Sequence, residues 1–145
     1  MRFEELTVGM AAERTRLVDD ALVLAFADLT EDHNPLHVDD VAAARSRFGA
    51  RVAHGMLSGG LISAVLGMDM PGPGSVWLSQ QMKFTKPVMV GDSITTRVEV
   101  VELMPEKKRV RLATTCRNQR GEATLEGEAV VQMMEELGET PNRRP

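Results

Sequence analysis

The chain has 145 residues, of which 43% are hydrophobic and 26% are charged, and its formal net charge is −4. This length and composition are typical of one globular domain with its own core. The absence of a basic block disfavours nucleic-acid binding, and no apolar run approaches the length that crosses a bilayer.

Two features of the sequence bear on cellular location. The chain starts with Met1-Arg2-Phe3-Glu4-Glu5, which is acidic and lacks an apolar export segment. Its single cysteine, Cys116, has no second thiol with which to form an internal disulfide. A reducing cytoplasm is the simplest interpretation of both features, so we expect a cytoplasmic protein without a membrane segment.

A short strand and a helix are predicted near the start of the chain. Residues 15–18 favour a strand. Residues 21–29 predict a helix, because apolar residues recur there at helical spacing. Asp19 or Asp20 is in the right place to cap the first turn of that helix.

Two further helices are predicted before the middle of the chain. Asn34-Pro35 interrupts the first helix, since proline disfavours helical geometry in the residue before it. Residues 41–46 follow as a short helix with acids at its positive end. Gly55 opens residues 56–68, which are apolar or small nearly all round, as in a buried helix. Gly59-Gly60 weakens that helix, and a close backbone approach would explain why both glycines are tolerated.

The second half of the chain is strand-like. Four segments show two-residue alternation or β-branched runs, with turn-like residues between them. Helices first and strands last indicate an α+β fold, an antiparallel sheet with helices on one face. We expect one domain over residues 1–134 and a polar, fraying tail over residues 135–145. The four predicted strands are residues 76–85, 93–103, 109–117 and 123–134.

The residues with the clearest chemical potential are Asp32, Asn34 and His37, which lie within six residues beside Pro35. A carboxylate and an imidazole held together can bind one water and share its protons, which typically accelerates a reaction about 10²–10⁴-fold. The asparagine can hold the loop through bonds to nearby backbone groups. On these residues alone, capping and turning the chain is the simpler interpretation.

Gly55 is a candidate for stabilising a negative oxygen. The first N–H groups of a helix lack internal partners and carry partial positive charge. Such donors can stabilise a developing oxyanion. The simpler interpretation is that Gly55 only lets the chain turn.

A metal site is disfavoured by the spacing of the histidines. His33 and His37 are four residues apart, but Pro35 lies between them and argues against a regular helix that presents both rings. No cysteine pair and no third nearby histidine completes a ligand set. We expect His54 to be structural or to line a pocket, and we expect no metal and no cofactor.

Several motifs, in order, resemble the MaoC-like family of (R)-specific enoyl-CoA hydratases. The resemblance covers roughly residues 26–100 and spans helix, loop and strand features. The matching runs are Asp32-His33-Asn34-Pro35-Leu36-His37, Phe48-Gly49, Ala53-His54-Gly55-Met56-Leu57, Pro71-Gly72-Pro73-Gly74-Ser75, Leu78-Ser79-Gln80, Lys83-Phe84, Pro87-Val88 and Val90-Gly91-Asp92.

The resemblance implies a hotdog fold, in which a curled antiparallel sheet wraps around a buried central helix. It also implies a homodimer that hydrates trans-2-enoyl-CoA reversibly, by syn addition, to (R)-3-hydroxyacyl-CoA. Carried over, the catalytic pair is Asp32 and His37, and the oxyanion donor is the N–H of Gly55. Asn34 would orient the active loop, and Ser63 would line the acyl pocket from the inner face of the central helix.

Two positions depart from the family pattern. Glu31 stands where the family often has glycine, and it would disfavour ionisation of Asp32 if the two carboxylates were close. We expect Glu31 to point to solvent instead. Gly60 stands where relatives carry a bulkier residue, which predicts a wider acyl pocket and acceptance of chains longer than four carbons.

An acyl-CoA substrate carries phosphates, so basic residues are expected at the rim of its tunnel. For any one of them, an ordinary solvated surface charge is the simpler interpretation. The candidates are Arg45, Arg47, Arg51, Lys83 and Lys86.

Three other functions stay open at this point. A 3-hydroxyacyl-carrier-protein dehydratase shares the chemistry and differs in the acyl carrier. A hotdog thioesterase would direct water at the carbonyl carbon, which Asp32 and His37 around Asn34-Pro35 disfavour. A non-catalytic acyl-CoA-binding subunit is disfavoured because every expected catalytic residue is present. An exposed sheet edge would favour dimerisation in each case.

Overall fold

The computed structural model describes residues 1–134, whose strands form one five-stranded antiparallel sheet in the order β1-β3-β4-β5-β2. Consecutive strands β3, β4 and β5 are neighbours, whereas β2 pairs with β5 at one edge and β1 with β3 at the other. The strands are β1 (Ala11–Leu17), β2 (Ser75–Phe84), β3 (Ser93–Met104), β4 (Arg109–Arg117) and β5 (Ala123–Met133).

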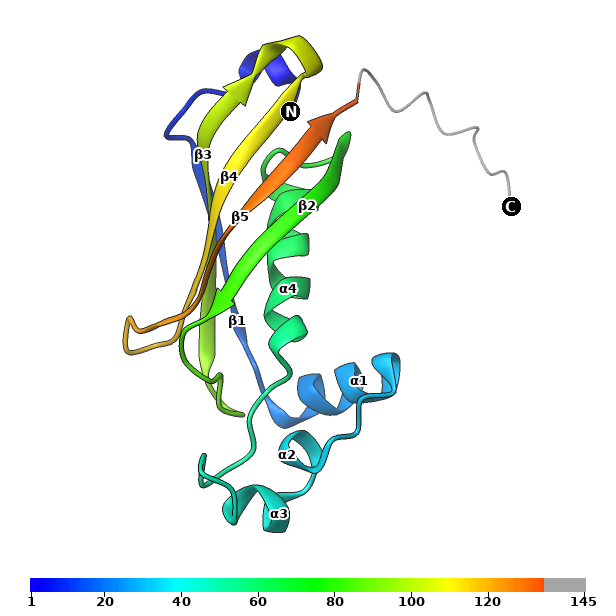
Figure 1. Ribbon diagram of the computed structural model, residues 1–145, viewed down its shortest axis with the longest axis vertical. Helices are drawn as coiled ribbons and strands as arrows, with labels where there is room; N and C mark the ends of the chain where they lie inside the picture. The colour runs from blue at the N-terminus through cyan, green and yellow to red at the C-terminus, as the bar shows by residue number, and fades with distance from the viewer. Residues whose placement is uncertain (135–145) are drawn as a thin grey trace, which may run out of the picture.

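A central helix, Gly55–Ala64, lies along one side of this sheet, and the three other α-helices gather at one end (Figure 1). This is the predicted hotdog arrangement of a curled antiparallel sheet and a central helix. The α-helices are α1 (Asp20–Thr30), α2 (Pro35–Val38), α3 (Asp40–Ala44) and α4 (Gly55–Ala64). The π-helix η2 (Val65–Asp69) extends α4, and η1 (Phe3–Glu5) and η3 (Pro105–Lys107) are 3₁₀ turns.

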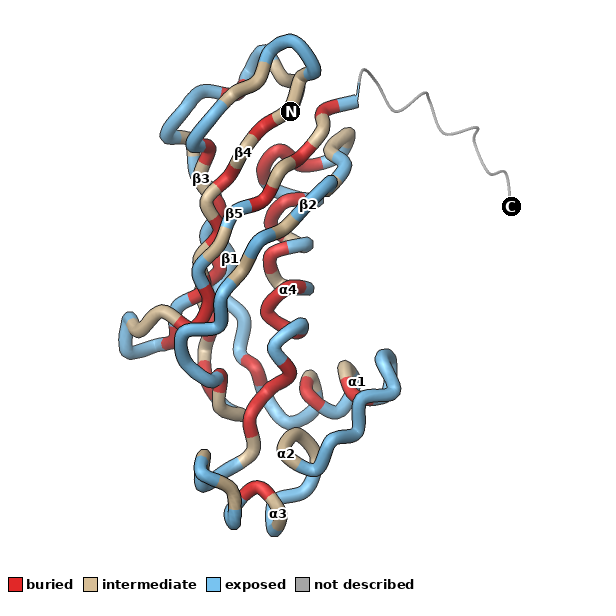
Figure 2. The backbone as a smooth tube through the Cα atoms, in the orientation of Figure 1, coloured by how far each residue is buried: buried red, intermediate tan, exposed pale blue. Residues whose placement is uncertain are grey.

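The core forms between the sheet and the side of α4 that faces it (Figure 2). Buried residues alternate along β3 and β4, because successive strand side chains point to opposite faces. Leu57 and Ile62 are the apolar side chains that α4 buries. The opposite face of α4 is exposed in the single chain and includes Met56, Gly60 and Ser63, so the helix is covered on one side only.

The strand and helix predictions are confirmed in the main, although several ends differ by one or more residues. β1 starts at Ala11, four residues before the predicted strand, because this edge strand is exposed almost throughout and shows no apolar alternation. α1 ends at Thr30, before Asn34-Pro35 is reached, and Glu31 follows it in a left-handed backbone. Pro35 instead begins α2, because proline at the first helical turn needs no N–H partner.

The predicted close backbone approach at Gly59-Gly60 is wrong. A Cβ atom built on Gly59 would lie 3.0 Å from the side-chain Cε of Met56, and one on Gly60 would meet nothing within 4 Å. The close approach occurs instead at Gly127 in β5, where a Cβ would lie 2.0 Å from the carbonyl oxygen of Gln81. Only glycine fits at this position, where the paired strands β5 and β2 lie so close together.

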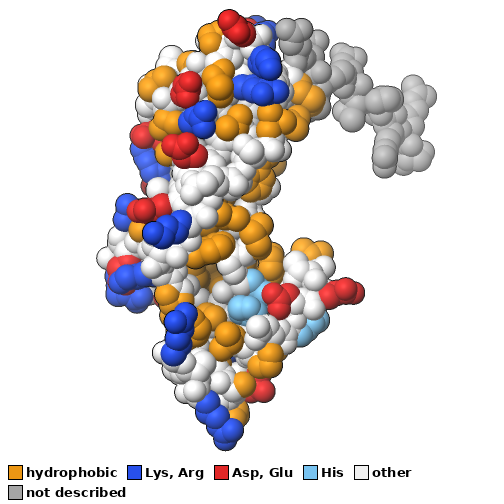
Figure 3. Space-filling model, viewed as in Figure 1, with side chains coloured by type: hydrophobic (Ala, Val, Ile, Leu, Met, Phe, Trp, Pro, Cys, Tyr) orange, Lys and Arg blue, Asp and Glu red, His pale blue; other side chains and the backbone are white. Residues whose placement is uncertain are grey.

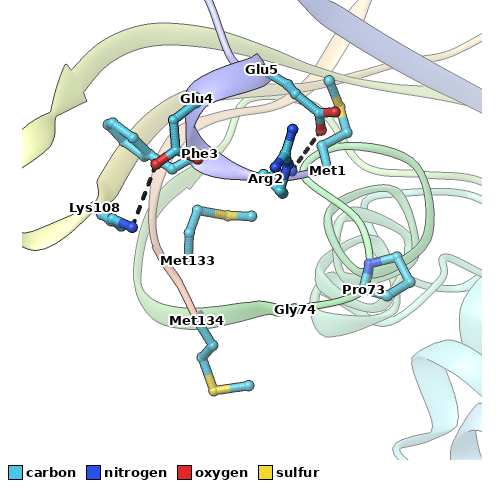
Figure 4. Close-up of a pocket in the computed structure, with 10 residues that line it drawn as sticks. All are labelled: Met1, Arg2, Phe3, Glu4, Glu5, Pro73, Gly74, Lys108, Met133 and Met134. Carbon is cyan, nitrogen blue, oxygen red and sulfur yellow. Dashed lines mark hydrogen bonds and ion pairs between the residues drawn. The ribbon is translucent and has the colours of Figure 1, made fainter. Parts of the chain in front are cut away.

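No helix among the described residues is long and apolar enough to cross a membrane. A cavity of about 430 Å³ lies at the end of the sheet where the chain starts, far from α1 and α2 (Figures 1 and 4). It is lined by η1 and by Met133, Met134 and Lys108. The predicted tail, residues 135–145, lies outside the described residues.

Candidate active site

The loop between α1 and α2 is held by side chains that bond to nearby backbone groups. Asp32 accepts a hydrogen bond from the backbone N–H of Asn34, with 3.2 Å between Oδ1 and N. Asn34 accepts one at Oδ1 from the N–H of Leu36 at 3.1 Å and thereby caps α2. Asn34 therefore shapes the loop that carries Asp32, as the sequence predicted from its turn chemistry.

His37 lies in the single turn of α2, and its ring is fixed by the chain that follows α3. Its Nδ1–H donates to the carbonyl oxygen of Val52 at 2.6 Å, because a carbonyl can only accept. In the neutral ring, Nε2 then carries a free lone pair. His37 thus offers one proton-accepting nitrogen in a set orientation.

His54 ends the segment that leads into α4 and contacts both other groups. Its side chain is buried, at 4% exposure, and its Nε2–H donates to the backbone carbonyl oxygen of Asp32 at 2.9 Å. Its ring stacks on that of His37 with 3.8 Å between centroids and 28° between planes. The ring of Phe26 in α1 also packs against His54, with 4.8 Å between centroids and 52° between planes.

Gly55 is the first residue of α4, so its N–H points out of the helix and has no intrahelical partner. The ring of Phe84, at the end of β2, lies directly over it. A Cβ on Gly55 would come within 2.9 Å of Phe84 Cζ. Glycine therefore keeps the positive end of α4 open to a bound oxygen atom.

The predicted catalytic groups line one cavity of about 400 Å³. Figure 3 shows histidine and carboxylate side chains beside hydrophobic surface where the molecule is hollowed above α2. The cavity is lined by Phe26, Thr30, Asp32, His37, His54, Gly55, Met56 and Phe84. A second cavity of about 340 Å³ shares His54, Gly55 and Phe84 and brings in the cations Arg47 and Lys86.

Asp32, His37 and His54 also form a group that could hold a metal ion, with one ligand atom from each within 4.8 Å of the others. The expectation that no third histidine is nearby is therefore wrong in three dimensions. The lone pairs of a ligating imidazole lie in its ring plane, and two stacked rings direct them side by side rather than onto one point. Proton transfer fits this arrangement better than ligation.

Other predicted residues lie outside both cavities. Ser63 is exposed on the open face of α4, so its place in an acyl pocket stays a prediction, as does the widening at Gly60. Arg45 and Lys83 are exposed and line neither cavity. Arg51 is not at a rim: its Nε donates to the carbonyl oxygen of His37.

His33 is separate from the site although it adjoins Asp32. Its Nε2 lies 2.9 Å from a carboxylate oxygen of Asp28, and this hydrogen bond raises the pKa of the imidazole. Glu31 is exposed, as predicted, and adopts a left-handed backbone with φ of 66° at the end of α1.

Three contributors to the site were missed or misplaced in the sequence interpretation. Phe26 carried helical periodicity, and Phe84 lay in a strand and in one motif of the resemblance. Arg51 was considered as a cation at the rim of the CoA tunnel or on the surface. Their contacts join α1, β2 and the chain before α4, and no local pattern reports such contacts. A basic residue four positions before a helix-opening glycine was the only available signal for Arg51.

The chain matches the family model described as MaoC like domain over residues 5–134. It is 47% identical over 131 residues to the 3-hydroxybutyryl-CoA dehydratase of Methylorubrum extorquens, covering 90% of this chain and 83% of the relative. It is 44% identical over 129 residues to the (R)-specific enoyl-CoA hydratase of Rhodospirillum rubrum, covering 89% of each.

Solved structures agree with these sequence relatives. The unliganded R-hydratase PhaJ1 of Pseudomonas aeruginosa superposes with a TM-score of 0.88 at 41% identity, over 99% of this chain and 96% of that one. The (R)-hydratase of A. caviae involved in PHA biosynthesis superposes with a TM-score of 0.87 at 42% identity, over 90% of this chain and 98% of that one.

Proposed function

The chain belongs to the MaoC-like domain family, and on that premise we propose that it is an (R)-specific enoyl-CoA hydratase, a hydro-lyase acting on trans-2-enoyl-CoA. The observation that carries the proposal is one cavity into which a carboxylate, an imidazole and a helix N-terminus all open. Asp32, His37 and Gly55 supply these three groups.

The spacing of the two acceptors suits one water molecule. A carboxylate oxygen of Asp32 and a ring nitrogen of His37 lie within 4.8 Å. A water that donates to two acceptors at about 2.8 Å holds them roughly 4.5 Å apart. Asp32 and His37 would therefore take one hydrogen bond each from the water and leave its oxygen lone pair free to attack.

The reaction follows from these positions. The N–H of Gly55 polarises the thioester carbonyl, which lowers the electron density at C3 and stabilises the enolate. The water oxygen bonds to C3 while Asp32 receives its proton, with His37 orienting the water. The proton taken from the water is then delivered to C2 on the same face, which completes the syn hydration and returns Asp32 to its ionised form. Dehydration uses the same groups in reverse.

The test follows the ultraviolet absorbance of the enoyl thioester after addition of crotonyl-CoA. Wild type should remove the absorbance, and Asp32→Asn and His37→Gln should abolish the loss while circular dichroism shows intact folding. Chiral analysis of the product should give the (R) isomer. A wild type that is inactive on both crotonyl-CoA and a longer enoyl-CoA would contradict the proposal.

The acyl carrier separates this proposal from its nearest alternative. A relative at 32% identity is named a mitochondrial 3-hydroxyacyl-[acyl-carrier-protein] dehydratase, of Arabidopsis thaliana. The relatives at 44% and 47% carry names that specify CoA, which favours CoA here. Comparing crotonyl-CoA with crotonyl-carrier protein at equal concentration tests this choice, and release of free thiol would instead indicate a thioesterase.

We also propose that two chains pair through β2 and the open face of α4. β2 is an edge strand, and an unpaired edge favours association. Large hydrophobic side chains are exposed on both elements, which a partner chain would cover. They are Met56, Val76, Leu78 and Phe84, with exposures of 54%, 38%, 45% and 52%. Light scattering should give twice the chain mass at micromolar concentration, and a monomer would contradict the pairing.

Residues 1–134 are proposed to act as one hydratase domain located in the cytoplasm. The family match over residues 5–134 supports the domain limits. Cys116 is a buried, free thiol, and burial raises its pKa, which keeps it protonated and unreactive. Expression of residues 1–134 alone should give an active protein if this division is right.

A further inference from the structure

His54 contacts each of the three groups assigned to the reaction, and the proposed mechanism gives it no chemical step. We infer that His54 is a positioning residue, which sets the distances among Asp32, His37 and the N-terminus of α4. The inference rests on the proposed hydratase function and adds a residue to it.

The first contact fixes the loop that carries the base. The Nε2–H of His54 donates to the backbone carbonyl oxygen of Asp32 across 22 positions of sequence, at 2.9 Å. Asp32 is otherwise exposed, and within residues 1–134 its side chain bonds only to its own loop. The His54 bond therefore connects that loop to the start of α4.

The second contact fixes the plane of the His37 ring. Rotation of the His37 ring about its Cβ–Cγ bond would break the hydrogen bond from Nδ1 to the carbonyl of Val52. The face of His54, with 3.8 Å between ring centroids, also restricts that rotation, and the ring of Phe26 in turn packs against His54. The lone pair of His37 Nε2 is thus aimed by a stacked neighbour.

The third contact is covalent. His54 is the N-cap residue of α4, and its carbonyl accepts the N–H of Leu57 at 3.1 Å. The residue that holds Asp32 and His37 is therefore joined directly to Gly55. A shift of His54 would move the base and the oxyanion donor relative to each other.

The unpaired nitrogen of His54 distinguishes positioning from simple packing. Its Nδ1 is buried and has no hydrogen-bond partner within residues 1–134. A buried acceptor without a partner lowers stability, and such costs are tolerated mainly where function needs the group. Replacing the ring with an apolar one of the same shape should therefore preserve or raise stability while it lowers activity.

Two substitutions separate the contacts. His54→Phe keeps the stack on His37 and removes the bond to Asp32, whereas His54→Gln can keep the bond and removes the stack. Each should lower kcat on crotonyl-CoA at least about tenfold with KM within about twofold, because substrate binding groups remain in place. The melting temperature of His54→Phe should equal or exceed that of wild type.

His33 provides the matched control. It is one residue from Asp32, exposed, and outside both cavities. His33→Phe and His33→Gln should leave kcat and KM at wild-type values. Wild-type kcat in both His54 variants, or a raised KM with unchanged kcat, would overturn the inference. An inactive wild type would instead overturn the proposed hydratase function.

A measurement on wild type decides the matter if the variants do not fold. Nitrogen-15 NMR of labelled histidine should show His54 protonated at Nε2 alone and His37 protonated at Nδ1 alone near neutral pH. If the neutral ring of His54 carried its proton on Nδ1, the inference would be overturned. Nε2 would then be an acceptor and could not donate to the Asp32 carbonyl, and the buried Nδ1–H would lack an acceptor.

Discussion

Arg51 donates from Nε to the backbone carbonyl oxygen of His37 at 2.6 Å, and its Nη1 lies 2.5 Å from a carboxylate oxygen of Asp20 at the start of α1. The side chain is 10% exposed. One guanidinium therefore joins the start of α1 to the turn that presents His37. The planar fork of arginine makes the two bonds from separate nitrogens, whereas a lysine would have to make both from its one nitrogen.

We expect Arg51→Lys to lower both stability and kcat. The loss of one charge-assisted hydrogen bond costs about 1.5–3 kcal/mol of unfolding free energy. A small displacement of His37 should reduce kcat about tenfold. Urea unfolding and the crotonyl-CoA assay measure the two effects, and Arg45→Lys, at an exposed position of the same segment, is the control. Loss of stability with unchanged kcat would show that Arg51 supports the fold alone.

The contact of Gly55 with Phe84 gives a second prediction. Gly55→Ala retains the backbone N–H, but its methyl group would lie 2.9 Å from the ring of Phe84, which would have to move. Because this ring lines the cavity, we expect kcat/KM to fall about tenfold, equivalent to about 1.4 kcal/mol.

The double variant Gly55→Ala/Phe84→Leu provides the internal control for this contact. The smaller side chain leaves room for the methyl group, so part of the lost activity should return. If Phe84→Leu adds its own loss to that of Gly55→Ala, with no recovery, the two residues do not interact in the way that the structure indicates.

The strands were the most predictable part of the fold. The bounds of β4 agree with the prediction at both ends, because Val110, Leu112 and Thr114 alternate with residues of the other sheet face. The start of β1 was missed because an exposed edge strand buries too little to impose alternation. A strand is therefore easier to predict from apolar alternation when one of its faces is buried and the other is exposed.

The site was predictable only where its residues adjoin in sequence. Asp32, Asn34 and His37 belong to one short motif, and Gly55 opens a recognisable helix. The role of His54 beside them depends on a bond across 22 positions, and the sequence alone left it as a general pocket or structural residue. Tertiary packing of α1, α2 and α4 brings these groups together, and no periodic pattern encodes that packing.

Glu31 leads to a prediction about stability. It adopts φ of 66° and ψ of 15° at the end of α1, in the left-handed region that costs most residues energy. This explains why glycine would suit the position before Asp32. Glu31→Gly should stabilise the protein by about 0.5–1 kcal/mol, after allowance for the greater freedom of glycine in the unfolded chain.

Glu31→Ala is the matched control, because it removes the same charge without relieving the left-handed backbone. It should give no gain in the urea midpoint, while kcat stays at the wild-type value in both variants. Equal stabilisation by alanine and glycine would show that removal of the charge beside Asp32, and not backbone strain, is responsible.

The turn between β4 and β5 predicts how stability depends on pH. Lys86, Arg120 and Asn118 all donate to the carboxylate of Glu122, and these hydrogen bonds lower its pKa from 4.5 to about 2. Folding thus favours the ionised form. The resulting stability is fully present above pH 4.5, where the unfolded carboxyl is ionised, and is lost as the pH falls toward 2. Glu122→Gln should therefore be less stable than wild type at neutral pH.

That difference between Glu122→Gln and wild type should shrink steadily below pH 4.5, because protonation removes the same charge from wild type. Urea midpoints from neutral pH down to about 2 measure the effect. Glu126→Gln, at an exposed position in β5, should run parallel to wild type over the whole range. A Glu122→Gln curve that also runs parallel to wild type would mean that the three donors hold the turn without favouring the charge.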